Sequence, residues 1–397
     1  MKKYLLLVSA VIFIASSVSA QGNGSKNYIV VFKDDVEDVQ SSTEDLKRGR
    51  GLEVAHVYGH ALKGFAGTIP AHELTSLKND PRVAFISEDG EVSIQKVPSA
   101  TPGQQILPTG INRINAENKA NKGAGVNVAV IDTGIDLDHP DLVANIVGGK
   151  NCQTGTSYDD GNGHGTHVAG TIAARNNTIG VVGVAPEAKL WAVRVLNNSG
   201  TGTWSSIICG IDFVTSKAPA NGGPITLANM SLGGAGASDN NCGNSNNDAL
   251  HRAICRSRDA GVTYVVAAGN NNGNASASVP AAYNDAVITV SALADYDGAS
   301  GNDTFASFSN YGSVVDIAAP GVNIRSTWKG GGYATISGTS MATPHITGSA
   351  ALYLATHPGS SWIVIRDALK TLGEQLGNGH TDPTGLHPEE VVRVDTL

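Results

Sequence analysis

The hydrophobic positions of the chain follow two patterns, and the pattern changes near residue 105. Before that point, short runs rich in Val, Ile and aromatic residues predict strands in "NYIVVFK" (27–33), "GFAGTIP" (64–70) and "VAFISEDGEVSI" (83–94). Two polar segments between them, "DVQSSTEDLKRGRG" and "AHELTSLKNDP", predict helices. We therefore expect residues 27–95 to form a small α+β unit, of a size that is marginally stable alone.

Beyond residue 105 the apolar runs are continuous. In "VNVAVID" (126–132) β-branched residues follow one another, as a parallel strand buried on both faces requires. Similar runs occupy residues 189–196, 225–232, 262–269 and 286–293. Helix-like segments lie between them, among them "GTHVAGTIAA", "SSIICGIDFVTSKA" and "NDALHRAICRSRDAG". This alternation predicts an α/β fold with an open, mostly parallel sheet, whose ligand site lies at the carboxyl ends of the strands.

The first residues have the pattern of a signal for export. Lys2 and Lys3 precede an apolar run from residue 4 to 15, and small residues end it at 18–20. The run is shorter than the roughly 20 apolar residues of a membrane-spanning helix, and no later segment is long and apolar enough either. We expect a signal peptide over residues 1–20 and a secreted, extracellular protein that is not held in a membrane.

Composition and charge narrow the function classes. Hydrophobic residues make up 41% of the 397 residues and charged residues only 16%, which favours a large buried core over disorder. The net charge of −8 argues against a nucleic-acid partner, because phosphate contacts need clustered Lys and Arg.

The four cysteines favour disulfides, since their number is even and the chain carries an export signal. No C-x-x-C spacing supports a zinc site. Cys242 and Cys255 form the easiest local pair, and Cys152 with Cys209 follows by elimination; two other pairings stay open at this stage.

Three residues of candidate chemistry stand at the starts or ends of predicted elements. Asp132 ends a strand in "AVIDTGID", His164 stands at a helix start in "DGNGHGTHVAGT", and Ser340 at another in "ISGTSMATPH". Each has a plainer explanation. Asp132 is a common turn residue, and His164 with His167 has the spacing of metal ligands but lacks the glutamate of H-E-x-x-H. Ser340 is a good helix cap, with Pro344 in the first turn.

Together the three side chains indicate acyl transfer. A serine hydroxyl is a weak nucleophile until an imidazole takes its proton, and a carboxylate orients and stabilises that imidazole. A helix N-terminus at Ser340 favours the developing oxyanion. No G-x-G-x-x-G follows the strand before Asp132, so a nucleotide-binding enzyme is disfavoured. A non-catalytic binding protein with the same fold is the remaining alternative.

"VIDTGID", "GHGTHVAGT" and "GTSMATPH" resemble the three signature blocks of the subtilisin superfamily. "GNGHGTH", "FSNYGS" and "STW" are most similar to its proteinase K branch. The resemblance covers residues 105–375, and residues 27–95 resemble the inhibitory pro-region of the same family. It implies a three-layer subtilisin-like sandwich and a serine endopeptidase made as a zymogen, which cleaves protein or peptide substrates through an acyl-enzyme.

The resemblance also implies a domain order. Residues 1–20 are the signal peptide, 21–97 the propeptide, and 98–397 the peptidase domain, expected as a monomer. The prodomain acts as intramolecular inhibitor and folding aid. The linker "KVPSATPGQQ" (96–105) is exposed and cleavable.

The resemblance further implies roles for single residues. Asn270, in "AAGNNNG", donates to the oxyanion beside the Ser340 backbone. The substrate pairs with the strand of "MSLGG" and enters a primary pocket without charged walls, so an apolar residue is preferred before the cut. The residues that line this strand and pocket are Ser231, Leu232, Gly233, Ala268 and Gly269.

A structural calcium ion is the remaining implication. Asp316, in "VVDIAAPG", matches a calcium-binding carboxylate of proteinase K relatives, with carbonyls near Asp285 and Val287 completing the shell. No cofactor is implied for the chemistry itself. Val168 occupies a position where the proteinase K branch often has a free cysteine, so the disulfides of that branch cannot be transferred.

Overall fold

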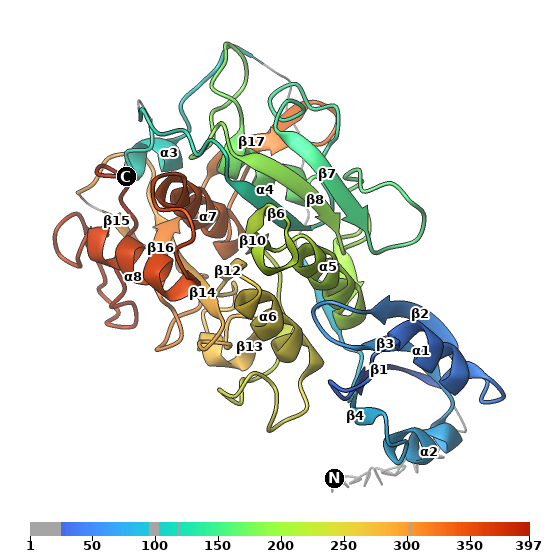
Figure 1. Cartoon of the computed structure of the whole chain (residues 1–397). Helices are drawn as coiled ribbons and strands as arrows, with labels where there is room; N and C mark the ends of the chain where they lie inside the picture. The colour runs from blue at the N-terminus through green and yellow to red at the C-terminus, as the bar shows by residue number, and fades with distance from the viewer. Residues whose placement is uncertain (1–24, 95–102, 118, 302) are drawn as a thin grey trace, which may run out of the picture.

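The computed structural model describes residues 25–94, 103–117, 119–301 and 303–397 (Figure 1). The predicted signal peptide and most of the predicted linker lie outside these residues. The described chain forms a small antiparallel unit, at the blue end of the colour scale, and a larger α/β unit. Both units were predicted from the apolar pattern, and the fold class is confirmed. No helix in the described part of the chain is long and apolar enough to cross a membrane.

The small unit is a four-stranded antiparallel sheet with two helices on one face. Its strand order is β2-β3-β1-β4. The elements are β1 (Lys26–Phe32), α1 (Val39–Lys47), β2 (Glu53–Tyr58), β3 (Gly64–Ile69), η1 (Ala71–Glu73), α2 (Leu74–Lys78) and β4 (Val83–Glu88). Phe32 and Phe65 pack edge to face on the helix side, together with Leu46 and Leu77. The opposite face of the sheet packs on the larger unit.

The large sheet carries the candidate site. Its strand order is β19-β15-β14-β12-β10-β6-β8-β7, and β16 also pairs with β14. All its pairs are parallel except β14 with β15. The strands are β6 (Asn127–Asp132), β7 (Ile146–Asn151), β8 (Lys189–Arg194), β10 (Ile225–Met230), β12 (Thr263–Ala267), β14 (Val287–Ala294), β15 (Asp303–Phe305), β16 (Ile317–Pro320) and β19 (His380–Thr381).

Helices cover both faces of this sheet. They are α3 (Thr109–Arg113), α4 (His164–Ala173), α5 (Trp204–Ser216), η2 (Pro219–Asn221), α6 (Ala249–Asp259), η3 (Ala275–Ala277), α7 (Thr339–Thr356) and α8 (Trp362–Leu372). Short two-stranded pairs complete the unit: β5 (Glu91–Ser93) with β9 (Thr201–Thr203), β11 (Gly234–Ala235) with β13 (Ser278–Val279), and β17 (Ile324–Trp328) with β18 (Gly332–Ile336).

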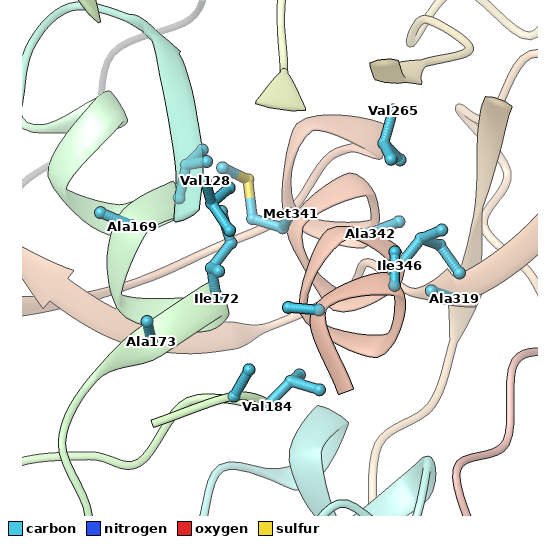
Figure 2. Packing of buried hydrophobic residues seen from close by; sticks show 14 of the residues in the cluster. Val128, Ala169, Ile172, Ala173, Val184, Val265, Ala319, Met341, Ala342 and Ile346 are labelled. Carbon is cyan, nitrogen blue, oxygen red and sulfur yellow. The ribbon is translucent and has the colours of Figure 1, made fainter. Parts of the chain in front are cut away.

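Alternation along β6 shows the three layers. Val128 and Val130 pack in the core that contains α4 and α7, whereas Ala129 and Ile131 pack in the core that contains α5 and α6. Side chains alternate across a strand, so a strand between two helical layers is apolar on both faces. Figure 2 shows the first of these cores, where Val128 lies between the apolar faces of α4 and α7.

The order of the strands places the site. β6 pairs with β8 on one side and with β10 on the other, so the chain reverses its direction of winding between β6 and β10. Ligands of open α/β sheets bind at such a switch point, beyond the carboxyl ends of the strands. Asp132 is the last residue of β6, and Ser231 follows the last residue of β10.

Both predicted disulfides are present. Cys152–Cys209 joins the segment after β7 to α5, and Cys242–Cys255 joins a loop to α6. Each disulfide therefore joins an irregular segment of the larger unit to a helix, and the two partners lie on the same face of the large sheet.

Candidate active site

Asp132 and His164 form a buried, hydrogen-bonded pair. His164 Nδ1 lies 2.8 Å from Asp132 Oδ1 and 3.0 Å from Asp132 Oδ2. Since a carboxylate only accepts, Nδ1 carries the proton, which leaves Nε2 as the basic nitrogen of the neutral ring. Asp132 is fully buried, and His164 is nearly so.

The carboxylate of Asp160, which was not among the predicted site residues, fixes the start of α4. Asp160 accepts hydrogen bonds from the backbone of Asn162, Gly163 and Thr166. It thus satisfies free N–H groups at the helix N-terminus, where a negative charge is also favourable. The sequence signal for this role was its position four residues before His164, because Asp is a preferred residue just before a helix.

The pKa of His164 is raised above its ordinary value. Burial acts in the opposite direction, but the charge of Asp132, the hydrogen bond to Asp132 and the charge of Asp160 outweigh it. The protonated imidazole is therefore stabilised in the folded protein, which is what a base needs while it holds a proton taken from a nucleophile.

His167 is not part of a metal pair with His164. Burial lowers the pKa of His167 to about 3, and its Nε2 lies 3.0 Å from the carbonyl oxygen of Ile324. It is a neutral core histidine that bonds to β17.

Ser340 is held by reciprocal hydrogen bonds with Ser231. Ser231 Oγ donates to the carbonyl oxygen of Ser340 (2.8 Å), and Ser340 Oγ donates to the carbonyl oxygen of Ser231 (3.1 Å). Ser231 Oγ also accepts from the side chain of Asn229, which in turn accepts from Thr347 of α7. The end of β10 is therefore bonded to the start of α7.

Pro344 explains why Ser231 is needed. Pro344 was predicted to lie in the first turn, but α7 begins at Thr339 and Pro344 lies well inside it. A proline has no N–H, so the carbonyl of Ser340 loses its bond within the helix. Ser231 supplies the missing donor. The capping interpretation of Ser340 is wrong for a related reason: Gly338 is the N-cap, without a side-chain cap, and the Ser340 hydroxyl points to Ser231 instead.

In this conformation the Ser340 hydroxyl is not bonded to His164. The hydrogen bonds of the described residues include none between Ser340 Oγ and His164 Nε2. The two residues stand at the N-terminal ends of α7 and α4, which pack on each other through a shared apolar core (Figure 2). Nucleophile–base hydrogen bonds are often long or absent without substrate and tighten in the complex.

Asn270 is oriented by Thr339. Asn270 Oδ1 accepts from the backbone N–H of Thr339 (2.8 Å) and from its hydroxyl (2.9 Å). The Asn270 amide nitrogen is therefore free to donate. A Cβ built on Gly338 would lie 3.5 Å from Asn270 Nδ2 and 3.6 Å from the backbone nitrogen of Ser340. The two nitrogens thus border one small space, which a side chain at position 338 would enter.

The predicted substrate-binding residues differ in their exposure. Ser231 and Leu232 are buried, while Gly233 and Gly269 are half-buried. Ala268 packs its side chain in a small buried cluster, so any contact with a substrate comes from its backbone.

The end of the small unit, β5, lies along the predicted substrate strand. β5 pairs antiparallel with β9, and the N–H of Ile94 donates to the carbonyl oxygen of Gly200 (2.9 Å). A Cβ built on Gly234, the last residue of the predicted substrate strand "MSLGG", would lie 3.2 Å from the carbonyl oxygen of Glu91. β5 therefore runs between β9 and β11, as an added strand would.

Carboxylates fix the small unit on α5. Asp89 accepts from the N–H (2.9 Å) and the hydroxyl (2.6 Å) of Ser205 in the first turn of that helix. Asp212, on the same helix, accepts from the N–H groups of Gly59, His60 and Ala61. Hydrogen bonds to charged acceptors are the stronger kind, so these contacts hold β5 in register.

The predicted calcium ligands have close protein partners. Asp285 bonds through its carboxylate to His251 (2.7 Å), and its carbonyl oxygen accepts from Arg258. Asp316 accepts from the N–H of Thr289 and lies 3.8 Å from the guanidinium of Arg366. Burial raises the pKa of Asp316 to about 6. Two guanidinium groups thus lie next to the expected ligands, and Val287 is buried within β14. Calcium binding at Asp316 stays a prediction.

An aspartate, a histidine and a serine at the switch point of a parallel α/β sheet define a serine peptidase of the subtilisin type. Comparison with known families agrees. Residues 123–383 match the model of the subtilase family, and residues 27–95 match that of peptidase inhibitor I9. The chain belongs to the subtilase family and carries an I9 inhibitor unit ahead of the peptidase domain.

Curated relatives cover nearly the whole chain. Alkaline protease of Alkalihalobacillus alcalophilus is 40% identical over 96% of this chain and 94% of its own length. Subtilisin E of Bacillus subtilis (strain 168) is 38% identical over the same shares. Among solved structures, a cold adapted subtilisin-like serine proteinase has a TM-score of 0.61 at 35% identity and covers 72% of this chain and 97% of its own. The chain is thus a serine endopeptidase made as a zymogen.

Proposed function

We propose that Asp132, His164 and Ser340 are the catalytic residues of this endopeptidase. The hydrogen bond between His164 Nδ1 and Asp132 carries the proposal, because it leaves Nε2 as the base. His164 Nε2 takes the proton of the Ser340 hydroxyl as that oxygen attacks the scissile carbonyl, and later gives it to the leaving amine. Water then attacks the acyl-enzyme with the same base. The subtilisin family needs no cofactor for this chemistry.

Asn270 and the backbone N–H of Ser340 form the proposed oxyanion hole. Thr339 holds the carboxamide oxygen of Asn270, so the amide nitrogen faces the space beside the Ser340 nitrogen. Donors fixed before the reaction stabilise the oxyanion without any reorganisation.

The substrate adds a strand between β9 and the residues that follow β10, where β5 now lies. Ser231, Leu232 and Gly233 form one side, and Ala268 and Gly269 the opposite wall of the primary pocket. None of these residues is charged, so we expect broad specificity with an apolar residue before the cut.

We further propose that the protein is exported as a precursor and acts outside the cell as a monomer. Residues 1–20 are the signal peptide, 21–97 the propeptide, and 98–397 the mature enzyme. A nearer kinship with the proteinase K branch rests only on the motifs "GNGHGTH", "FSNYGS" and "STW". The relatives reported above are an alkaline protease and a subtilisin of bacilli.

A fluorophosphonate probe tests the catalytic assignment directly. It should label the processed enzyme at Ser340, and Ser340→Ala should remove the label. The matched control is Ser337→Ala, three residues earlier, which should be labelled normally. If the folded, processed enzyme takes up no probe, the chain is a binding protein that keeps the fold.

A further inference from the structure

An acidic cluster outside the proposed catalytic site lies in the loop between β14 and β15. This loop is at the edge of the large sheet, and α3 lies beside it (Figure 1): Asn112 of α3 donates to the carbonyl oxygen of Gly298 (2.8 Å). Asp295, Asp297 and Asp303 each offer one oxygen, and these three oxygens lie within 4.8 Å of one another.

Asp295 has an oxygen that nothing satisfies. The residue is only 1% exposed. Its Oδ1 accepts from the backbone N–H groups of Asp297 (3.1 Å) and Gly298 (2.7 Å). Its Oδ2 is buried and has no hydrogen-bond partner among the described residues. A buried carboxylate oxygen without a donor is costly and rare in folded proteins.

The charge of the cluster is not balanced by protein groups. Arg113 of α3 donates through Nε to Asp303 (2.6 Å), but another nitrogen of the same guanidinium donates to Glu374 (2.6 Å). Arg113 therefore contacts one of the three carboxylates and is shared with Glu374, so Asp295 and Asp297 have no cationic partner among the described residues.

We propose that Asp295, Asp297 and Asp303 bind one calcium ion. Asp295 and Asp297 lack a cationic partner among the described residues, and the unsatisfied Asp295 oxygen supplies a buried ligand. All donors are oxygens, which hard cations require. Calcium accepts irregular shells of carboxylates, carbonyls and water, whereas magnesium demands a near-ideal octahedron. Asp297 is exposed, which leaves the ion a path from solvent.

This site is distinct from the one expected at Asp316, where guanidinium groups already lie next to the oxygens. The ion would join the β14–β15 loop to the Arg113 network of α3, which also holds Glu374 near the C-terminal strand β19. Binding to the folded state alone raises stability by mass action.

The test counts bound ions in a full-length precursor that cannot digest itself. Ser340→Ala is the background, and equilibrium dialysis against Ca²⁺ gives the number bound per chain. Asp297→Asn is the test variant, since the exposed side chain can change without disturbing the core. Asp259→Asn removes the same charge from an exposed position elsewhere on the peptidase domain and is the matched control. The measurement does not depend on activity, so it stands apart from the proposed catalytic function.

We expect Asp297→Asn to lose one bound ion, or to bind it about tenfold or more weakly, because affinity follows the number of charged ligands. Asp259→Asn should keep the parental number. Tb³⁺ is a second probe: Tyr296, between two of the ligands and 71% exposed, should sensitise its luminescence. Tyr296→Phe should dim that signal without changing the number of ions bound.

An unchanged number and affinity in Asp297→Asn would overturn the site, as would a parental precursor that binds no calcium. Arg113 would then be the sole counter-ion of the cluster.

Discussion

Asn270 is the residue whose proposed role depends most on one orientation. The two hydrogen bonds from Thr339 to its Oδ1 leave only its amide nitrogen to face an oxyanion. Asn270→Ala should lower kcat by roughly 10²–10³-fold, a magnitude known from subtilisin itself, and should leave KM nearly unchanged because the donor acts in the transition state. Steady-state kinetics on a peptide substrate measure this.

The neighbouring Asn271 is the matched control. It is exposed like Asn270, and only its backbone N–H is hydrogen-bonded, to Asn310. Asn271→Ala should retain parental kcat. Equal losses in both variants would show that the loop, and not the amide donor, matters.

Asp132 should set the pH at which the enzyme becomes active. Activity requires neutral His164, so kcat/KM rises with pH through the raised pKa of that residue. Asp132→Asn removes the main groups that raise this pKa and leaves burial, which lowers it. The acid limb of the profile should therefore move to lower pH, while kcat falls about 10⁴-fold because the carboxamide holds the ring in the wrong tautomer.

The exposed neighbour Asp138 provides the comparison for this profile. Asp138→Asn removes an equal charge and should leave both the acid limb and kcat near their parental values. An acid limb that does not move in Asp132→Asn would mean that a group other than His164 limits the rate.

At the scale of the element, the start of α7 depends on a helix-breaking residue and a serine from another strand. Pro344 leaves the Ser340 carbonyl without an N–H, and Ser231 Oγ takes its place at 2.8 Å. Ser231→Ala should lower the free energy of unfolding by about 1–3 kcal/mol, since a buried carbonyl then lacks a donor. Denaturant unfolding of the Ser340→Ala precursor gives the value.

A double-mutant cycle with Pro344→Ala isolates the cause. Alanine at 344 restores an N–H that can bond to the Ser340 carbonyl, so Ser231→Ala should cost less in that background than with proline. Strictly additive effects would contradict this explanation of the Ser231 contact. The Ser231 backbone, which carries the proposed substrate contact, is unaltered in every variant.

Elements were predicted well where burial leaves a simple pattern. β6 was found because a parallel strand between two helical layers is apolar throughout. β2 was missed because it carries Glu53 and His56 at its partly exposed positions, so no apolar run marks it. Residues 83–94 were predicted as strand, but the chain breaks into β4 and β5 at Asp89 and Gly90, where Asp89 turns to the start of α5.

Only part of the candidate site could be predicted from the sequence. Asp132, His164 and Ser340 stand in contiguous motifs, so their types and order could be read directly. Partners from distant segments could not: Arg258 meets the carbonyl of Asp285, and Arg366 approaches Asp316, only once the chain has folded. The expected calcium shell at Asp316 stays a prediction for that reason, because it depends on backbone oxygens whose other partners the sequence does not reveal.

At the scale of the molecule, the small unit contacts the peptidase domain at several places, including α6, where Arg252 lies over the ring of Phe85. Its sheet packs on α5 through an apolar face, and β5 adds a strand to β9. Asp89 and Asp212 supply charged acceptors across this interface. The arrangement favours an inhibitor that also serves as a template, since the large parallel sheet is made of nonlocal contacts that form slowly.

We therefore expect the enzyme to remove its own propeptide. β5 leads from the small unit toward the proposed substrate strand. We expect the cut in the segment beyond Ile94, near residues 97–105. After the cut, the same strand remains as a product inhibitor until it dissociates or is digested. Ser340→Ala should accumulate as the intact precursor, whereas the parent should give a mature chain that begins near residues 97–105. Mass spectrometry of the purified proteins measures both.

A second experiment separates cleavage within one chain from cleavage between chains. A trace of mature parent enzyme is added to the Ser340→Ala precursor, and fast processing at a low enzyme ratio indicates cleavage between chains. A Ser340→Ala protein that matures at the parental rate, purified away from other proteases, would show that another enzyme does the processing.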